Sequence, residues 1–110
     1  MHPFKNDLFE MMYRSFDRLF PNHKECYIQW CTQDELDEIE ASGNCEWHDD
    51  GSIWVYVSTG QSVEHALDTL AHELSHVAVG FEHQHDDAFK LAYNFIQVGF
   101  EVIIEETFGT

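Results

Sequence analysis

Apolar residues recur at helical spacing in three stretches of the 110-residue chain. Intervals of three and four residues place such side chains on one face of an α-helix, where they can pack against a core. The pattern therefore predicts three amphipathic helices. They cover residues 6–20, 62–79 and 87–107.

Residues with special backbone preferences mark the ends of these helices. Pro21 stops the first helix, because a proline cannot continue the hydrogen-bond ladder. Ser62 can cap the second helix, and Gly80 stands where that helix should end. Gly99 interrupts the apolar pattern of the third stretch, so we expect one long helix that can bend at this glycine.

Shorter stretches rich in β-branched and aromatic residues predict strands. Residues 44–48 and 52–57 flank an Asp-Asp-Gly turn at 49–51, a sequence typical of a β-hairpin. The sequence pattern predicts a further strand over residues 26–30 and a short acidic helix over residues 33–41. This order of elements predicts an α+β fold, in which helices cover a small and mostly antiparallel sheet.

The second predicted helix carries the sequence His72-Glu73-Leu74-Ser75-His76. Histidines four positions apart are neighbours on one helix face, so both imidazoles can reach one metal ion at Zn–N distances of about 2.1 Å. Glu73 lies beside the metal position, where a carboxylate can take a proton from water that the metal has acidified. This combination is typical of zinc metallopeptidases.

A catalytic zinc usually has three protein ligands and one position for water, so the motif needs a third ligand. His83 and His85 follow the motif helix directly. Asp86 or Asp87 can cap the next helix, which places His85 at a helix N-terminus, where packing would hold its backbone. We therefore predict His85 as the third Zn²⁺ ligand, with His83 as the alternative.

Two further residues can assist the motif. Asp68 lies four residues before His72, so its carboxylate can hydrogen-bond a ligand imidazole and orient it. An ordinary helix carboxylate is an equally good interpretation of Asp68. Tyr93 can reach the site as an oxyanion donor, although its position in an apolar pattern favours the core.

At this point the residues resemble a known family. The sequence TLAHELSH at residues 69–76, followed after a short loop by HDxxF from His85 to Phe89, resembles the SprT-like and WLM-type zincin metallopeptidases. The resemblance covers roughly residues 52–97, and the pair of motifs is fairly specific. It implies a minimal zincin fold with the motif on its central helix. It also implies that strand 52–57 is the sheet edge along which an extended peptide substrate adds.

The resemblance assigns roles to individual residues of this chain. It implies that His72, His76 and His85 bind zinc and that Phe89 packs behind the site. Glu73 would then be the general base for hydrolysis of a peptide bond. The expected function is a zinc metallopeptidase that acts on a peptide or protein substrate.

Other interpretations of these residues remain open. The pair His72 and His76 can be a solvated helix face that hydrogen-bonds to carboxylates. The metal can also be structural, in a zinc-stabilised binding module without turnover. A gluzincin arrangement would instead take Glu101 as a ligand from the final helix.

Composition indicates one folded domain over residues 1–110. A hydrophobic content of 44% and an aromatic content of 15% favour a packed core over disorder. The chain has no run of about 18 apolar residues, and its start lacks the layout of a secretory signal. Its three cysteines form no C-x-x-C pair and do not indicate a disulfide framework. We therefore expect a cytoplasmic protein.

The formal net charge of −16 restricts the partners of the chain. Nucleic acids and anionic membranes repel such a surface, whereas basic regions of a protein substrate attract it. No cysteine follows Cys45, whereas SprT-like proteins often continue into a cysteine-rich zinc ribbon and contact DNA. Direct binding of nucleic acid is therefore not expected. An acidic surface can also imitate DNA, so an inhibitor of a nucleic-acid-binding protein is an alternative function.

Overall fold

The computed structural model describes residues 8–32, 43–80 and 85–109. These residues form three helices and a three-stranded sheet, which confirms the α+β class. In chain order the elements are α1 (Leu8–Leu19), β1 (Cys26–Cys31), β2 (Gly43–Trp47), β3 (Ile53–Ser58), α3 (Val63–Val79) and α4 (Asp87–Phe108). The helix predicted over 33–41 and the candidate ligand His83 lie outside the described residues.

The strands are arranged in the order β1-β3-β2, so β3 is the middle strand of the three. β3 runs parallel to β1 and antiparallel to β2, so the sheet is mixed rather than mostly antiparallel. The prediction that residues 52–57 form the sheet edge is wrong. β1 pairs with β3 in register from Cys26 with Ile53 to Cys31 with Ser58. β2 pairs with the other side of β3, so neither side of β3 is left open for an extended peptide.

The hairpin between β2 and β3 forms as predicted. Gly51 adopts a φ of 90°, a left-handed conformation that favours glycine. The Asp50 carboxylate accepts hydrogen bonds from the backbone N–H and the hydroxyl of Ser52, at 2.9 and 2.6 Å. The His48 N–H donates to the Ser52 carbonyl at 3.0 Å, which closes the turn. These local bonds set the register of β2 against β3.

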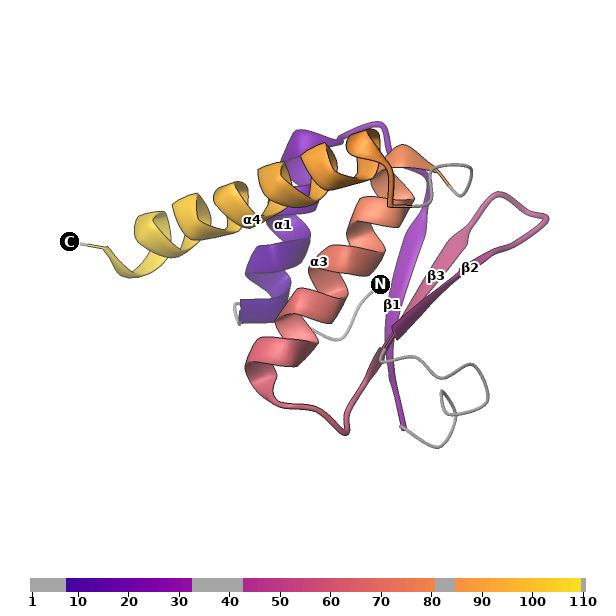
Figure 1. The fold of residues 1–110 in the computed structure, drawn as a ribbon, viewed down its shortest axis with the longest axis horizontal. Helices are drawn as coiled ribbons and strands as arrows, with labels where there is room; N and C mark the ends of the chain where they lie inside the picture. The colour runs from indigo at the N-terminus through magenta and orange to yellow at the C-terminus, as the bar shows by residue number, and fades with distance from the viewer. Residues whose placement is uncertain (1–7, 33–42, 81–84, 110) are drawn as a thin grey trace.

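The helices lie together on one face of the sheet (Figure 1). α3 contacts β2 and β3 on one side, and α1 and α4 on the other. Alternate residues of the strands point inward, because successive side chains of a strand face opposite sides of the sheet. The fully buried core side chains include Phe16 of α1, Val55 and Val57 of β3, Leu74 of α3 and Ile96 of α4.

Gly99 allows α1 and α4 to pack closely and does not interrupt α4. α4 continues through Gly99 as a single helix of 22 residues. A Cβ atom at position 99 would overlap Oγ of Ser15 on α1. The Ser15 hydroxyl is buried and donates to the Ile96 carbonyl at 2.7 Å, so it is fixed close to this glycine. No described helix, α4 included, combines the length and apolarity needed to cross a membrane.

Candidate metal centre

The HExxH sequence lies in the C-terminal half of α3, and both ends of this helix are capped as predicted. The Ser62 hydroxyl accepts from the His65 N–H at the start of the helix. At its end, Gly80 adopts a φ of 93° and its N–H donates to the His76 carbonyl at 2.9 Å. His72 and His76 lie one turn apart on one face, with ring centroids separated by 5.0 Å. The helix thus provides two neighbouring imidazoles.

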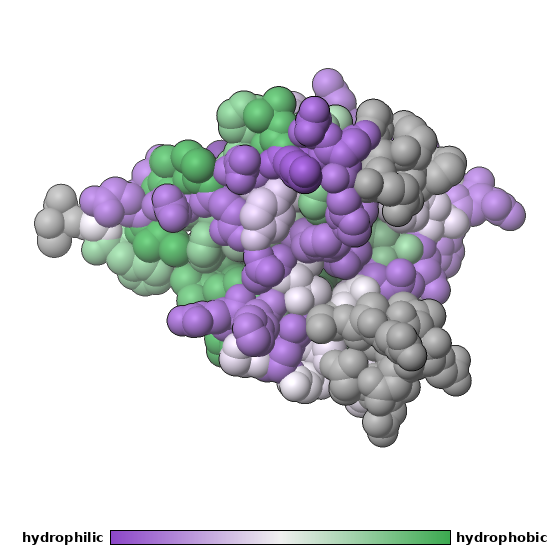
Figure 2. Space-filling model, viewed as in Figure 1, coloured by the Kyte–Doolittle hydropathy of each residue, from purple (hydrophilic) through white to green (hydrophobic). Residues whose placement is uncertain are grey.

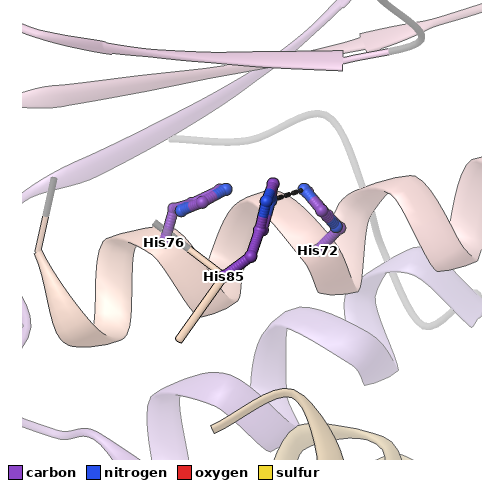
Figure 3. Close-up of side chains that lie close together, drawn as sticks. All are labelled: His72, His76 and His85. Carbon is purple, nitrogen blue, oxygen red and sulfur yellow. Dashed lines mark hydrogen bonds between the residues drawn. The ribbon is translucent and has the colours of Figure 1, made fainter. Parts of the chain in front are cut away.

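His85 brings a third imidazole to this face from the start of α4. Asp86 caps α4 by accepting from the Phe89 N–H at 3.0 Å, so His85 is held immediately before the cap. Its φ of 57° is left-handed, an uncommon conformation for a residue with a side chain. Its Nε2 lies 3.0 Å from Nε2 of His72 (Figure 3). The predicted third ligand therefore meets the motif.

The three imidazoles form a group that can bind a metal ion. One nitrogen of each ring lies within 4.8 Å of one nitrogen of the other two. Figure 3 shows the rings of His72, His76 and His85 turned toward a shared space beside α3. Tetrahedral Zn²⁺ with Zn–N bonds of about 2.1 Å separates its nitrogen ligands by roughly 3.4 Å. To hold an ion, the Nε2 atoms of His72 and His85 would move slightly apart from 3.0 Å, and spacings near the 4.8 Å limit would contract. Imidazole is a donor that suits zinc.

Phe89 packs against all three histidines. The centroid of its ring lies 5.0 Å from that of His72, 4.6 Å from that of His76 and 4.8 Å from that of His85. Phe89 itself is buried, with 6% of its surface exposed. A rigid ring in this place limits the rotamers of the imidazoles and excludes water from one side of them. The position behind the site that the family resemblance implied for Phe89 agrees with this packing.

Glu73 is buried between α3 and the sheet, whereas His72 and His76 are half-buried and His85 is exposed. Only 8% of its surface is exposed, and burial raises the pKa of its carboxyl from 4.5 to about 7. The thiol of Cys45 on β2 donates to Oε1 of Glu73 at 3.3 Å, which opposes this shift. The same thiol lies 3.3 Å from the backbone carbonyl oxygen of Glu73. A carboxyl with a pKa near neutrality suits the task of a general base.

Cys45 was not recognised as a site residue from the sequence, where it fits an ordinary core position in a strand. Burial, followed by the charge of Glu73, raises the pKa of its thiol, so the thiol stays protonated and acts as a donor. Gly43 allows this contact, because a Cβ at position 43 would overlap the Thr69 side chain and lie 3.3 Å from Cγ of Glu73. The sequence signal is the two-residue spacing of Gly43 and Cys45, which places both on the face toward α3.

Asp68 and Tyr93 form a network of their own beside the histidines. The Tyr93 hydroxyl donates to the Asp68 carboxylate and accepts from the Gln97 amide at 3.2 Å. Burial and the neighbouring His85 lower the pKa of His72, whereas the charge of Asp68 opposes this effect. Asp68 therefore acts on His72 through its charge, and its hydrogen-bond partner in the structure is Tyr93. The aromatic ring of Tyr93 stacks on Phe89 at 6.4 Å.

The remaining candidate ligands lie away from the histidine group or outside the described residues. Glu101 is exposed on α4, four turns after His85, and does not join the group. His65, a further histidine of α3 that was not predicted as a ligand, is exposed and does not join the group. His83, the alternative third ligand, is not among the described residues.

No protein-family model matches the chain, and neither the curated proteins nor the solved structures contain a significant match.

Proposed function

We propose that this protein is a zinc-dependent peptidase in which His72, His76 and His85 hold the metal and Glu73 is the general base. The observation that supports this proposal is the convergence of three imidazoles beside a buried glutamate. Two of the imidazoles and the glutamate come from consecutive turns of α3, and the third comes from the start of α4.

The residues present suit zinc in their chemistry and in their number. Three imidazole nitrogens are the donor set of many catalytic zinc sites, and they leave a coordination position for water or substrate. When bound, zinc would polarise the carbonyl of the scissile peptide bond and make a nearby water more acidic. Phe89 limits the freedom of the three rings, so little side-chain entropy is lost when they bind the ion.

The Glu73 carboxylate would move the proton in the reaction. It accepts a proton from the attacking water and passes it to the nitrogen of the leaving amine. Its pKa near 7 in the metal-free protein allows both steps near neutral pH, and a bound cation favours its ionised form. Cys45 holds the carboxylate from the sheet side, so its orientation does not depend on solvent.

The strand that adjoins Glu73 is β2, which lies at an edge in the order β1-β3-β2 of the described strands. A substrate in extended conformation would pair its main chain with β2, on the side opposite β3. This pairing brings the scissile bond close to Glu73, because Cys45 in the middle of β2 contacts that residue. The role expected for the strand at 52–57 thus passes to β2 in this proposal.

The test combines a peptide library with metal depletion and one substitution. Purified zinc-loaded protein should cleave members of the library, a chelator should stop cleavage, and added zinc should restore it. Glu73→Gln should keep zinc and lose turnover by about a thousandfold or more, the scale of a lost general base together with its positioning. Glu64→Gln, an exposed glutamate on the same helix, is the matched control and should remain active.

Two results would replace the proposed function. Stoichiometric zinc without cleavage of any library member would indicate a zinc-stabilised binding module. Absence of zinc, with tight binding to a basic nucleic-acid-binding protein, would indicate an acidic inhibitor that imitates DNA. Cleavage that persists in Glu73→Gln would remove the assignment of this residue as the base.

A further inference from the structure

α4 carries a row of large apolar side chains that face solvent. Leu91, Phe95, Val98 and Val102 are exposed over 55, 51, 58 and 50% of their surfaces. Figure 2 shows hydrophobic surface along α4, which extends away from the sheet in Figure 1. An apolar row of this kind on an otherwise acidic protein is typical of an interaction surface. We call these four residues the α4 stripe.

The spacing of the α4 stripe is that of a helix–helix seam. Its members follow one another at intervals of four, three and four residues, the alternation of a and d positions in a coiled coil. The opposite face of α4 is already used, because Phe89, Ala92, Ile96 and Ile103 are buried. α4 thus has two apolar faces, one against the protein and one toward solvent. The solvent face has the pattern that a second helix recognises.

The charges beside the α4 stripe are acidic. Asp87 and Glu101 lie at one flank, at the g positions, whose charges determine partner preference in coiled coils. Glu105 occupies the next d position of the seam. All three are exposed. Glu106 at the other flank is paired with Arg18 at 2.9 Å. Among the described residues, Asp87 and Glu105 take part in no ion pair, so the seam presents apolar surface with carboxylates at both of its ends.

These charges argue against a second copy of the chain as the occupant. A parallel pair of α4 helices would set Glu105 against Glu105. An antiparallel pair with Phe95 opposite Val98 would bring Asp87 close to Glu105 and Glu106 of the other copy. Like charges in these positions oppose association, and the net charge of −16 adds to the repulsion.

We propose that the α4 stripe binds an amphipathic helix of a partner protein that carries lysine or arginine beside its apolar seam. Apolar side chains of the partner pack between Leu91, Phe95, Val98 and Val102. Its basic residues pair with Asp87, Glu101 and Glu105 at the flanks. The histidine group takes no part in this contact, so the inference stands apart from the proposed peptidase activity.

The test uses two synthetic helical peptides, each with leucine at a and d positions. One carries lysine at e and g positions, and the other carries glutamate there. Fluorescence anisotropy at about 0.15 M salt measures binding to the full chain. The lysine peptide should bind and the glutamate peptide should not. Val98→Glu should weaken binding of the lysine peptide by about tenfold or more, even though it adds a charge that attracts the peptide.

Matched variants keep this test specific. Val63 on α3 has the same exposed fraction as Val98, 58%, so Val63→Glu makes the same change elsewhere and should leave binding unchanged. Leu91→Gln provides a second change within the stripe that adds no charge, and it should also weaken binding. The double variant Glu101→Lys with Glu105→Lys should reverse the preference toward the glutamate peptide. His72→Ala should bind the lysine peptide like the unmodified chain.

Three results would overturn the inference. The first is equal binding of both peptides, or of neither. The second is equal loss of binding in Val63→Glu and Val98→Glu, which would indicate non-specific attraction to an acidic protein. The third is a dimer of the chain in sedimentation experiments that Val98→Glu dissociates, because a second copy would then be the occupant.

Discussion

The Nε2 atoms of His72 and His85 lie 3.0 Å apart, although the residues are 13 positions apart in the chain. Two imidazole nitrogens at this distance share one proton, since one ring donates and the other accepts. A divalent cation that replaces the proton would be bound by both nitrogens at once. The contact places the two rings close to the spacing of two ligands on one ion, so binding needs little rearrangement.

The backbone of His85 predicts a difference between two substitutions of this residue. His85→Ala and His85→Gly both remove an imidazole, so zinc affinity should fall by roughly a hundredfold or more in each. This loss exceeds the one expected when a residue that only supports a ligand is replaced. Glycine accepts the φ of 57° without strain, so the metal-free His85→Gly protein should be more stable than His85→Ala by about 1 kcal/mol. Urea denaturation in chelator, with zinc titration in parallel, measures both quantities. His65→Ala is the control, and equal stability of the two His85 variants would contradict the argument.

Substitution of Phe89 should affect both stability and metal binding. Phe89→Leu removes ring contacts to three imidazoles, so the free energy of unfolding should fall by about 1–2 kcal/mol and zinc affinity by about 10–100-fold. Phe95→Leu on the same helix is the control, because Phe95 is 51% exposed and its loss should change stability by less than about 0.5 kcal/mol. Thermal and urea unfolding, with isothermal titration of zinc, provide the comparison. Unchanged zinc affinity in Phe89→Leu would show that the ring does not position the ligands.

The raised pKa of Glu73 predicts how the stability of the metal-free protein depends on pH. A carboxyl whose pKa is about 7 when folded and 4.5 when unfolded stabilises the fold fully below pH 4.5. That contribution is lost as pH rises through 7, because the buried group must then ionise. Glu73→Gln removes this dependence. The free energy of unfolding of Glu73→Gln minus that of the unmodified chain should therefore be larger at pH 8 than at pH 4, by up to about 3 kcal/mol.

The groups around Glu73 are the same in both proteins, so the comparison of the two proteins carries the Glu73 prediction. His72 and His76 lie on the same helix, and the Cys45 thiol faces the carboxyl from β2. All of these remain in Glu73→Gln, and their direct contributions cancel in the difference. Urea denaturation in chelator at pH 4, 5, 6, 7 and 8 gives this difference. A difference that does not vary with pH would show that the carboxyl titrates as an exposed one.

The contact between Gly99 and Ser15 predicts a non-additive pair of substitutions. Gly99→Ala places a methyl group against the Ser15 hydroxyl, which must then give up its bond to the Ile96 carbonyl, so stability should fall by about 1–3 kcal/mol. In a Ser15→Ala background the same change meets no hydroxyl, and the helix propensity of alanine favours it by up to about 1 kcal/mol. Denaturation of the four proteins measures the coupling. Equal effects of Gly99→Ala in both backgrounds would exclude the contact as the reason for this glycine.

Features with a local physical cause were predictable from the sequence. The caps at Ser62 and Gly80, the turn at Gly51 and the cap at Asp86 each depend on neighbours within four residues, and the structure confirms them. Helix periodicity likewise predicted that His72 and His76 share a face. The meeting of His85 with His72 followed from the short connection between two capped helices.

Features that depend on contacts between distant elements were not predictable in the same way. The apolar pattern of β3 suits an edge strand as well as a middle strand, because it does not specify the parallel partner β1. The contact of Cys45 with Glu73 joins residues 28 positions apart and arises from the packing of the sheet on α3. Gly99 shows the same limit: a glycine within a helix suggests a bend, whereas its cause here is the approach of Ser15 from α1.

The most direct test of the central claim is the coordination of zinc in solution. X-ray absorption of the zinc-loaded protein should show one zinc per chain with three imidazole nitrogens and one further oxygen donor, and His85→Ala should reduce the imidazole count to two. Failure to bind zinc would contradict the account, and so would a zinc with four protein donors and no water.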